Sequence, residues 1–388
     1  MTAIKSIRRK LYSLVAARMF KGKAIILIGP RQVGKSTLFR MLDEENGLNA
    51  LMLNCDDPDV RLMLTSLSTA KMRLLVADYK TVIIDEAQRV DSIGLTIKRL
   101  VENFPDVQIL VTGSSSLDLQ SAINEPLTGR KYEYFMYPVS TGELLDTGGL
   151  SCVSDLFIPR LIYGSYPEIL THPDEALELL TGLAGSYLYK DILEMDGVRR
   201  PVILDKLLVA LALQVGSEVS YSEVAQTVGS DPRTVEKYID LLEKCFVVRR
   251  LGALSRNLRN ELKKSKKIYF YDTGIRNAII KNFAEPGLRT DMGALWENFF
   301  IMERIKRNAY LGISPNYYFW RTTSQQEIDF IEEIDGKMNL FELKWNPRTS
   351  SKFPESFLRS YSVRMSAVVN PENYIDYLCP LNNVRIKN

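Results

Sequence analysis

Short apolar runs recur through the first third of the chain, and segments with helical spacing separate them. The runs occupy residues 24–28, 50–53, 81–84 and 108–112. Unbroken apolar runs of this length indicate strands that are buried on both faces of a sheet. Helical periodicity is found between them, at residues 35–42 and 92–103. This alternation predicts an α/β fold in which helices cover both sides of a parallel sheet.

The pattern changes after about Thr141, where helical spacing takes over. Helices are predicted at 156–163, 175–183 and 187–193. A compact unit follows between Pro201 and Tyr271, and a mixed segment begins near Met292. We therefore expect four domains, with the bounds 1–140, 141–200, 201–275 and 276–388.

A glycine-rich loop follows the first apolar run. The segment Gly-Pro-Arg-Gln-Val-Gly-Lys-Ser at 29–36 matches the pattern G-x-x-x-x-G-K-[ST] and lies between a predicted buried strand and a predicted helix. The backbone N–H groups of such a loop, and the positive end of the helix, face phosphates. Lys35 is expected to reach the β- and γ-phosphates of ATP and to take part in catalysis, and Ser36 to ligate Mg²⁺. The predicted nucleotide-binding residues of this segment are Gly29, Pro30, Arg31, Gln32, Val33, Gly34, Lys35, Ser36 and Thr37.

Two acids, Asp85 and Glu86, end the third apolar run, as in a Walker B strand. We expect Asp85 to bind the nucleotide-associated Mg²⁺, directly or through water. Glu86 is expected to polarise the attacking water as a general base. The second acid favours ATP hydrolysis over phosphoryl transfer to a small molecule.

Two further residues are candidates for the same site. Ser114 follows the fourth apolar run and is expected to sense the γ-phosphate or to position water. Arg130, in Leu-Thr-Gly-Arg, is a candidate for the arginine that stabilises charge in the transition state. It could act on the nucleotide of its own chain or on that of a neighbour.

These motifs together resemble a family of prokaryotic AAA-type ATPases that carry a C-terminal domain of unknown function. The resemblance rests on Gly-Pro-Arg-Gln-Val-Gly-Lys-Ser, Ile-Asp-Glu-Ala-Gln, Thr-Gly-Ser-Ser and Leu-Thr-Gly-Arg, and continues almost to the end of the chain. It implies an AAA-like sheet, a winged-helix segment and a restriction-endonuclease-like end.

Residues 201–275 have the pattern of a winged helix-turn-helix. A first helix is predicted to begin at Ser220, a turn at Gly229, and a second helix at Pro232. The second helix has its apolar stripe at Val235, Ile239 and Leu242. Its other side chains, Arg233, Thr234, Lys237 and Tyr238, are thereby placed to read a groove of DNA.

A basic run at residues 255–267 lies between two predicted strands of a hairpin, 246–251 and 267–271. At the tip of a wing, such a run is a candidate for contacts with nucleic-acid phosphates. The alternative is a winged helix that only packs domains together. The residues alone leave both open.

The last segment holds a constellation of acids and one lysine. Asp329 lies in a predicted strand, Asp335-Gly336 signals a hairpin turn, and Glu342 and Lys344 share one face of the returning strand. This arrangement resembles the D…E-x-K core of restriction-type nucleases, in which acids bind Mg²⁺ and the lysine steadies water or phosphate. We expect Asp329, Glu342 and Lys344 to be catalytic, and Glu297 to join Asp329 and Glu342 as a metal-binding acid.

Composition narrows these interpretations. The net charge is +3, so the field of the whole molecule says little about partners. No uninterrupted apolar run approaches the ~18 residues of a membrane helix, and residues 1–23 lack the features of a secretory signal. The four cysteines, at 55, 152, 245 and 379, are widely spaced and suit a reducing compartment, so we expect a cytoplasmic protein. The single histidine, His172, is expected in a loop.

Two functional hypotheses remain after a small-molecule kinase is set aside. In the first, an Mg²⁺-dependent ATPase drives or gates cleavage of nucleic acid at the C-terminal site. In the second, the ATP state controls binding of DNA or a partner protein, and the nuclease-like domain is an inactive platform. A homo-oligomer is compatible with both.

Overall fold

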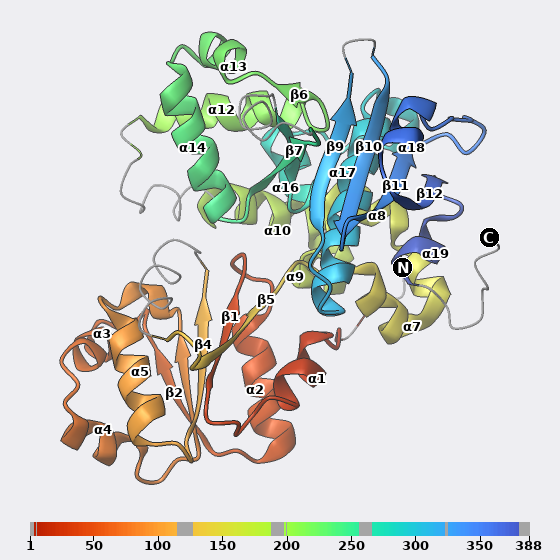
Figure 1. Ribbon diagram of the computed structural model, residues 1–388. Coiled ribbons are helices and arrows are strands. Elements are labelled where there is room, and N and C mark those ends of the chain that lie inside the picture. Colours follow the sequence, from red (N-terminus) through yellow and green to blue (C-terminus); the bar gives the residue numbers. More distant parts are fainter. Residues whose placement is uncertain are drawn as a thin grey trace. The chain divides into compact units, whose positions relative to one another are not determined.

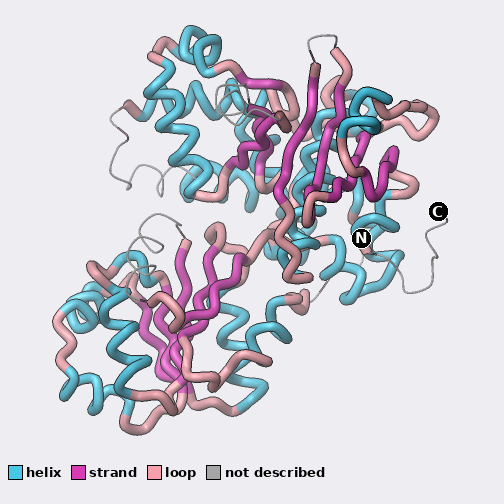
Figure 2. The backbone as a smooth tube through the Cα atoms, in the orientation of Figure 1, coloured by secondary structure: helices cyan, strands magenta, loops and turns pink. Residues whose placement is uncertain are grey.

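The computed structural model of the chain describes residues 4, 6–114, 127–187, 198, 200–255, 266–322 and 325–379. The chain forms two compact units. The first in the chain, which we call the ATPase unit, comprises residues 7–138 with 244–246. The second, the C-terminal unit, comprises residues 139–243 and 247–388 together with residues 1–6. Figures 1 and 2 show the helices and strands of each.

The ATPase unit is a five-stranded parallel sheet in the order β2-β3-β4-β1-β5. Figure 1 shows α1 and α2 on one side of it and α3 to α5 on the other. The elements are α1 (Leu11–Ala16), β1 (Ala24–Ile28), α2 (Lys35–Asn46), β2 (Ala50–Asn54), α3 (Pro58–Thr65), α4 (Thr69–Val76), β3 (Thr81–Asp85), η1 (Ala87–Arg89), α5 (Ile93–Asn103), β4 (Gln108–Gly113) and β5 (Lys131–Phe135).

Three of the five strands are buried at every position, namely β1, β3 and β4, because helices cover both faces of the sheet. The parallel α/β sheet that the apolar runs predict is therefore confirmed. The structure adds β5, which pairs in parallel with β1 at the edge of the sheet. It has no apolar run, because an edge strand is only half buried.

The C-terminal unit begins with helices. They are α7 (Thr141–Asp155), α8 (Phe157–Tyr163), α9 (Pro167–Thr171), η2 (Pro173–Glu175), α10 (Ala176–Gly182) and the π-helical turn η3 (Leu183–Tyr187). The expected helices at 156–163 and 175–183 correspond to α8 and α10. The one expected at 187–193 lies, beyond Tyr187, outside the described residues.

The described part of residues 201–279 contains four helices and three strands. The elements are α12 (Pro201–Leu213), β6 (Glu218–Val219), α13 (Tyr221–Val228), α14 (Pro232–Lys244), β7 (Val248–Ala253), β8 (Lys266–Phe270) and α16 (Thr273–Ile279). The turn between α13 and α14 contains Gly229 at φ 73°, a conformation that glycine adopts without strain. Helix, turn, helix and antiparallel hairpin thus follow each other in the expected order.

The last segment has the element order helix, three strands, helix, strand, helix. The elements are α17 (Met292–Tyr310), β9 (Asn316–Arg321), β10 (Glu327–Ile334), β11 (Lys337–Leu343), α18 (Glu355–Ser360), β12 (Val363–Val369) and α19 (Tyr374–Leu378), with a short 3₁₀ turn η4 (Pro286–Leu288) before them. Strands β9, β10 and β11 are antiparallel neighbours, and β12 pairs in parallel with β11.

One seven-stranded sheet spans the last two expected domains, in the order β12-β11-β10-β9-β7-β8-β6. The junction is the parallel pair β7 and β9, where Gly252 lies opposite Tyr318 and Ala253 opposite Phe319. Backbone hydrogen bonds therefore join the hairpin to the C-terminal strands across the boundary expected at 275/276, which stays a prediction.

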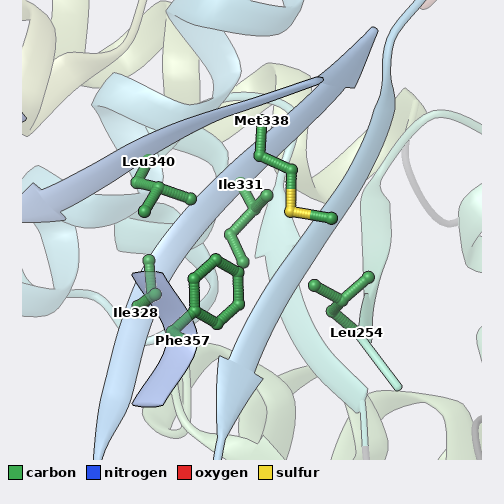
Figure 3. Packing of buried hydrophobic residues seen from close by; sticks show 6 residues of the cluster. All are labelled: Leu254, Ile328, Ile331, Met338, Leu340 and Phe357. Carbon is green, nitrogen blue, oxygen red and sulfur yellow. The ribbon is translucent and has the colours of Figure 1, made fainter. Parts of the chain in front are cut away.

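The apolar core of this sheet lies under α18. Figure 3 shows Phe357 of α18 among buried side chains of β10 and β11. The cluster consists of Leu254, Ile328, Ile331, Met338, Leu340 and Phe357. This packing fixes the strands that carry Asp329 and Glu342.

Candidate functional site

The glycine-rich loop runs from the end of β1 to the start of α2. At Gly29 a Cβ atom would lie 2.2 Å from the carbonyl oxygen of Met136, so only glycine fits the close approach of the two backbones. Gly34 caps α2 at φ 94°, in the left-handed region. Lys35 is buried, and its Nζ donates to the carbonyl oxygens of Gly29 at 2.9 Å and Pro30 at 2.7 Å. The ammonium is thus held over the loop that would receive the phosphates.

Asp85, the last residue of β3, faces the hydroxyl groups of two neighbouring elements. Ser36 Oγ donates to Asp85 Oδ1 at 2.7 Å, and Thr112 Oγ1 of β4 donates to the same oxygen. A hydroxyl and a carboxylate therefore converge beside the loop, which is the donor set expected for Mg²⁺ with a nucleotide. Nearby, burial and then the charge of Asp85 raise the pKa of the Cys55 thiol to about 12.

Glu86 begins η1 in a left-handed backbone conformation, with φ 53°. This conformation is uncommon for a residue with a side chain. The Glu86 N–H donates to Thr112 Oγ1 at 3.0 Å. Its Oε2 accepts hydrogen bonds from Ser114 Oγ at 3.1 Å and Gln88 Nε2 at 2.5 Å, and Gln88 Nε2 also lies 2.8 Å from Ser114 Oγ. The structure thus brings Glu86 and Ser114 together, and adds Gln88.

Two contacts of this site were not expected from the sequence. Gln88 and Thr112 both stand within the motifs Ile-Asp-Glu-Ala-Gln and Val-Thr-Gly, but only the pairing of β3 with β4 shows that they meet Asp85 and Glu86. Arg9 is the third residue that the sequence did not indicate. Its buried guanidinium donates to the carbonyl oxygens of Val33 and Tyr137 and so fixes the loop from outside.

Arg130 lies at the end of the strands opposite to the glycine-rich loop. In the register of the sheet, Ala24 of β1 pairs with Lys131, and the N–H of Ala24 donates to the carbonyl oxygen of Arg130. The glycine-rich loop follows the other end of β1, a strand length of about 16 Å away. The Arg130 guanidinium forms an exposed ion pair with Glu102 at 2.8 Å. The structure thus does not bring Arg130 together with Lys35 of its own chain, and its role in charge stabilisation stays a prediction.

Asp329, Glu342 and Lys344 come together on β10 and at the end of β11. Lys344 Nζ lies 2.9 Å from Glu342 Oε2 and 3.6 Å from Asp329 Oδ2. Asp329 also accepts the N–H of Leu343 at 2.7 Å, which orients its carboxylate. Burial and the neighbouring charge of Asp329 raise the pKa of Glu342, and the Lys344 ammonium partly opposes this shift.

Glu297 of α17 has its hydrogen-bond partners on β8. Its Oε1 accepts hydrogen bonds from Tyr269 Oη at 2.5 Å and from Lys267 Nζ at 3.1 Å. Burial raises the pKa of Glu297 to about 7, against the opposing effect of the Lys267 ammonium, and the nearby charge of Asp329 adds to the rise. Lys267 also pairs with Glu327 at 2.7 Å. Lys267, the last residue of the basic run at 255–267, is buried with 3% of its surface exposed.

The described residues contain no group of three or more His, Cys, Asp or Glu side chains that could hold a metal ion. Asp329 and Glu342 share Lys344 as a partner, whereas Glu297 is engaged by Lys267. The three acids expected to bind one metal thus do not form a common ligand set in this structure.

The helix-turn-helix exposes fewer polar side chains than its pattern predicts. Tyr238 is buried, with its hydroxyl accepting the N–H of Arg200 at 3.2 Å, because α14 packs this side against the preceding segment. Thr234 Oγ1 donates to Asp231 at 2.7 Å. Arg233 and Lys237 remain exposed. In the hairpin, Arg250 pairs with Asp240 and Glu243, and residues 256–265 of the basic run lie outside the described residues.

Three family models match successive parts of the chain. Residues 21–145 match the model of an AAA domain. Residues 154–285 match a domain of unknown function (DUF8612), and residues 292–384 match another (DUF4143). The AAA match, together with the geometry around Lys35 and Asp85, places a P-loop ATPase-like domain in the ATPase unit. It suggests ATP-hydrolysing activity, with nucleotide binding that is typically accompanied by Mg²⁺.

Relatives extend over the whole chain. An uncharacterised protein of Mycobacterium tuberculosis is 28% identical over 386 residues, covering 94% of this chain and 80% of that protein. An uncharacterised protein of Haemophilus influenzae is 28% identical over 261 residues, covering 64% of this chain and 62% of that protein. The RuvB Holliday junction branch migration motor of Thermotoga maritima has 14% identity and a TM-score of 0.34, covering 66% of this chain and 95% of that one. A similarity at that level says nothing about activity.

None of the helices in the described segments combines the length and the apolar character that are needed to cross a membrane.

Proposed function

We propose that the chain is an Mg²⁺-dependent ATPase that couples ATP binding and hydrolysis to a task on nucleic acid. The observation that carries the ATPase is the convergence of Ser36, Thr112 and Asp85 beside Lys35, with Glu86 one residue further on. Lys35 and the backbone N–H groups of residues 31–36 bind the phosphates. Ser36 and Asp85 hold Mg²⁺, which neutralises charge on the phosphates.

Glu86 is the general base of this proposal. Its carboxylate accepts the proton of the attacking water, while Ser114 and Gln88 hold Oε2 in place.

The test of the ATPase uses two variants that separate binding from turnover. Lys35→Ala is expected to abolish nucleotide binding, and Glu86→Gln to bind ATP but not to hydrolyse it. Arg40→Ala, on the exposed face of α2, is the matched control and retains both properties. Normal ATP hydrolysis by Lys35→Ala would refute the assignment.

The link to nucleic acid rests on the helix-turn-helix order of α13 and α14 and on the exposed side chains of Arg233 and Lys237. We expect labelled duplex DNA to bind the full chain with a salt-dependent affinity that differs between ATP and ADP. Arg233→Ala with Lys237→Ala should weaken this binding. Glu236→Gln on the same helix face is the control, and equal binding by all chains would leave the helix-turn-helix as a packing module.

A nuclease in the C-terminal unit is the second candidate function. It is supported by the meeting of Asp329, Glu342 and Lys344, which resembles the D…E-x-K core of restriction-type nucleases. Labelled single- and double-stranded DNA and RNA, incubated with Mg²⁺ or Mn²⁺ with and without ATP, test it. Cleavage that disappears in Lys344→Ala supports the nuclease. Its absence on every substrate, with ATP turnover intact, favours the alternative, an ATP-controlled switch that binds DNA or a partner protein through an inactive nuclease-like platform.

The proposed setting is the cytoplasm, where the thiol groups stay reduced. A homo-oligomer is part of the proposal, in which Arg130 would act on the nucleotide of a neighbouring chain; its distance from the glycine-rich loop of its own chain supports this.

A further inference from the structure

Lys267 is the charged residue near Asp329, Glu342 and Lys344 whose position the sequence predicts least well. Strand β8 carries it into the interior, where 3% of its surface is exposed. Its Nζ lies 3.1 Å from Glu297 Oε1 and 2.7 Å from Glu327 Oε1, and 5.4 Å from the centre of the Phe319 ring. A buried lysine requires such partners, because its charge is costly to remove from water.

One carboxylate oxygen of Glu297 already has two donors. Tyr269 Oη donates to Glu297 Oε1 at 2.5 Å, and Lys267 Nζ donates to the same oxygen at 3.1 Å. Gly216, in the turn that precedes β6, also lies close, since a Cβ atom built on it would be 3.5 Å from Oε2 and 3.6 Å from Oε1. A metal ion at Oε1 would have to displace one of the two donors.

The remaining carboxylates of the cluster have their own ammonium group. Lys344 contacts both Asp329 and Glu342, and Arg321 lies 3.9 Å from Glu327. Basic side chains thus face each of the four acids. A divalent cation would need to replace an ammonium group, because Mg²⁺ binds oxygen atoms directly at 2.0–2.1 Å.

We propose that Lys267 is a built-in cation that keeps divalent metal ions away from Glu297 and Glu327, and that removal of its charge turns these carboxylates into a metal site. Any metal at Asp329 and Glu342 is then bound without Glu297. The proposal uses the nuclease-like interpretation only to identify where a metal would be sought, and it is independent of the ATPase.

Equilibrium binding of Mn²⁺ to the full chain tests the proposal, at pH 8 and without nucleotide or nucleic acid. Free Mn²⁺ is measured by electron paramagnetic resonance for the wild type, Glu297→Gln, Lys267→Met and the double variant Lys267→Met/Glu297→Gln. Lys266→Met, the neighbouring position of β8, is the matched control. Sites elsewhere in the chain are common to all five proteins and cancel in the comparison.

We expect Glu297→Gln to leave Mn²⁺ binding of the wild type unchanged. Lys267→Met should gain one site or bind on the order of ten-fold more tightly, since a neighbouring positive charge is gone. The double variant should lose this gain. A thermal melt provides a second readout, in which Mn²⁺ raises the Tm of Lys267→Met but not that of the other chains.

Two outcomes overturn the proposal: weaker Mn²⁺ binding by Glu297→Gln than by the wild type, or no gain in Lys267→Met. If Lys267→Met alone does not fold, the wild type and Glu297→Gln decide, because Lys267 keeps Glu327 as a partner in the latter. ATP turnover is measured in the same proteins and is expected to be unchanged. If the wild type has no ATP turnover, the proposed ATPase is refuted, and the proposed role of Lys267 is unaffected.

Discussion

Ser114, which follows β4, donates a hydrogen bond to the carboxylate of Glu86, which follows the neighbouring strand β3, across 3.1 Å. The proposed γ-phosphate sensor and the proposed general base are therefore in direct contact. Gln88 closes a triangle with them, because its Nε2 reaches both side chains. The position of the base thus depends on two polar neighbours, and a change in either is expected to affect turnover before it affects nucleotide binding.

Gln88→Ala tests this dependence. Loss of the amide leaves Glu86 with one side-chain partner, so we expect the ATPase kcat to fall by about ten-fold while the Kd for ATP stays within about two-fold. The measurement is steady-state phosphate release alongside titration with a fluorescent ATP analogue. Arg89→Ala, next to Gln88 on η1, is the control, and an equal loss of kcat in both variants would argue against a specific role for the amide.

Arg9→Ala tests the support of the glycine-rich loop. The guanidinium holds the carbonyl oxygens of Val33 and Tyr137 from within the interior, so its removal leaves two buried acceptors without this donor. We expect ATP affinity to fall by about ten-fold, and Arg9→Lys to restore part of it. Arg8→Ala, whose side chain forms an exposed pair with Glu45, should bind ATP normally. Unchanged affinity in a folded Arg9→Ala protein would contradict the role.

The elements of the ATPase unit follow from local patterns, whereas several contacts of the site do not. Strands β1, β3 and β4 are buried on both faces, so each leaves an unbroken apolar run. Strand β5 is only half buried and leaves none. Lys35 and Ser36 belong to one continuous motif and could be identified from spacing alone.

Contacts between residues that are far apart in the sequence could not be predicted from the spacing of residues along the chain. The local glycine makes Arg130 a candidate for the site, but the pairing of Ala24 with Lys131 places it at the end of the strands opposite to the glycine-rich loop. Lys267 ends the basic run at 255–267, whereas the acids that pair with it come from α17 and β10, far away in the sequence. For both residues, the local sequence shows that the side chain is charged but does not show which side chains surround it.

Arg130→Ala is expected to leave ATP turnover per chain unchanged in dilute solution. The reason is that Arg130 pairs with Glu102 at the end of the strands opposite to the glycine-rich loop. If Arg130 acts on the nucleotide of a neighbouring chain, turnover per chain in the wild type rises with protein concentration and that rise is absent in Arg130→Ala. Glu102→Ala is the control for the ion pair. A loss of turnover in dilute Arg130→Ala would place the residue at its own nucleotide after all.

The buried pair of Arg160 and Glu303 predicts how the C-terminal unit responds to acid. Burial alone would raise the pKa of Glu303, but Lys306 at 2.7 Å and Arg160 at 2.8 Å lower it to about 2. A carboxyl group whose pKa is lower in the folded state stabilises the fold above its unfolded pKa of about 4.5, and this contribution is lost as the pH falls toward 2. The shift corresponds to about 3 kcal/mol.

Urea unfolding between pH 7 and pH 2.5 should show this loss in the wild type. In Glu303→Gln the C-terminal unit should be less stable at pH 7 and should lack this part of the pH dependence. Glu355→Gln, in an exposed pair with Arg359, should follow the wild type throughout. Equal pH dependence in Glu303→Gln and the wild type would show that other carboxyl groups control acid unfolding.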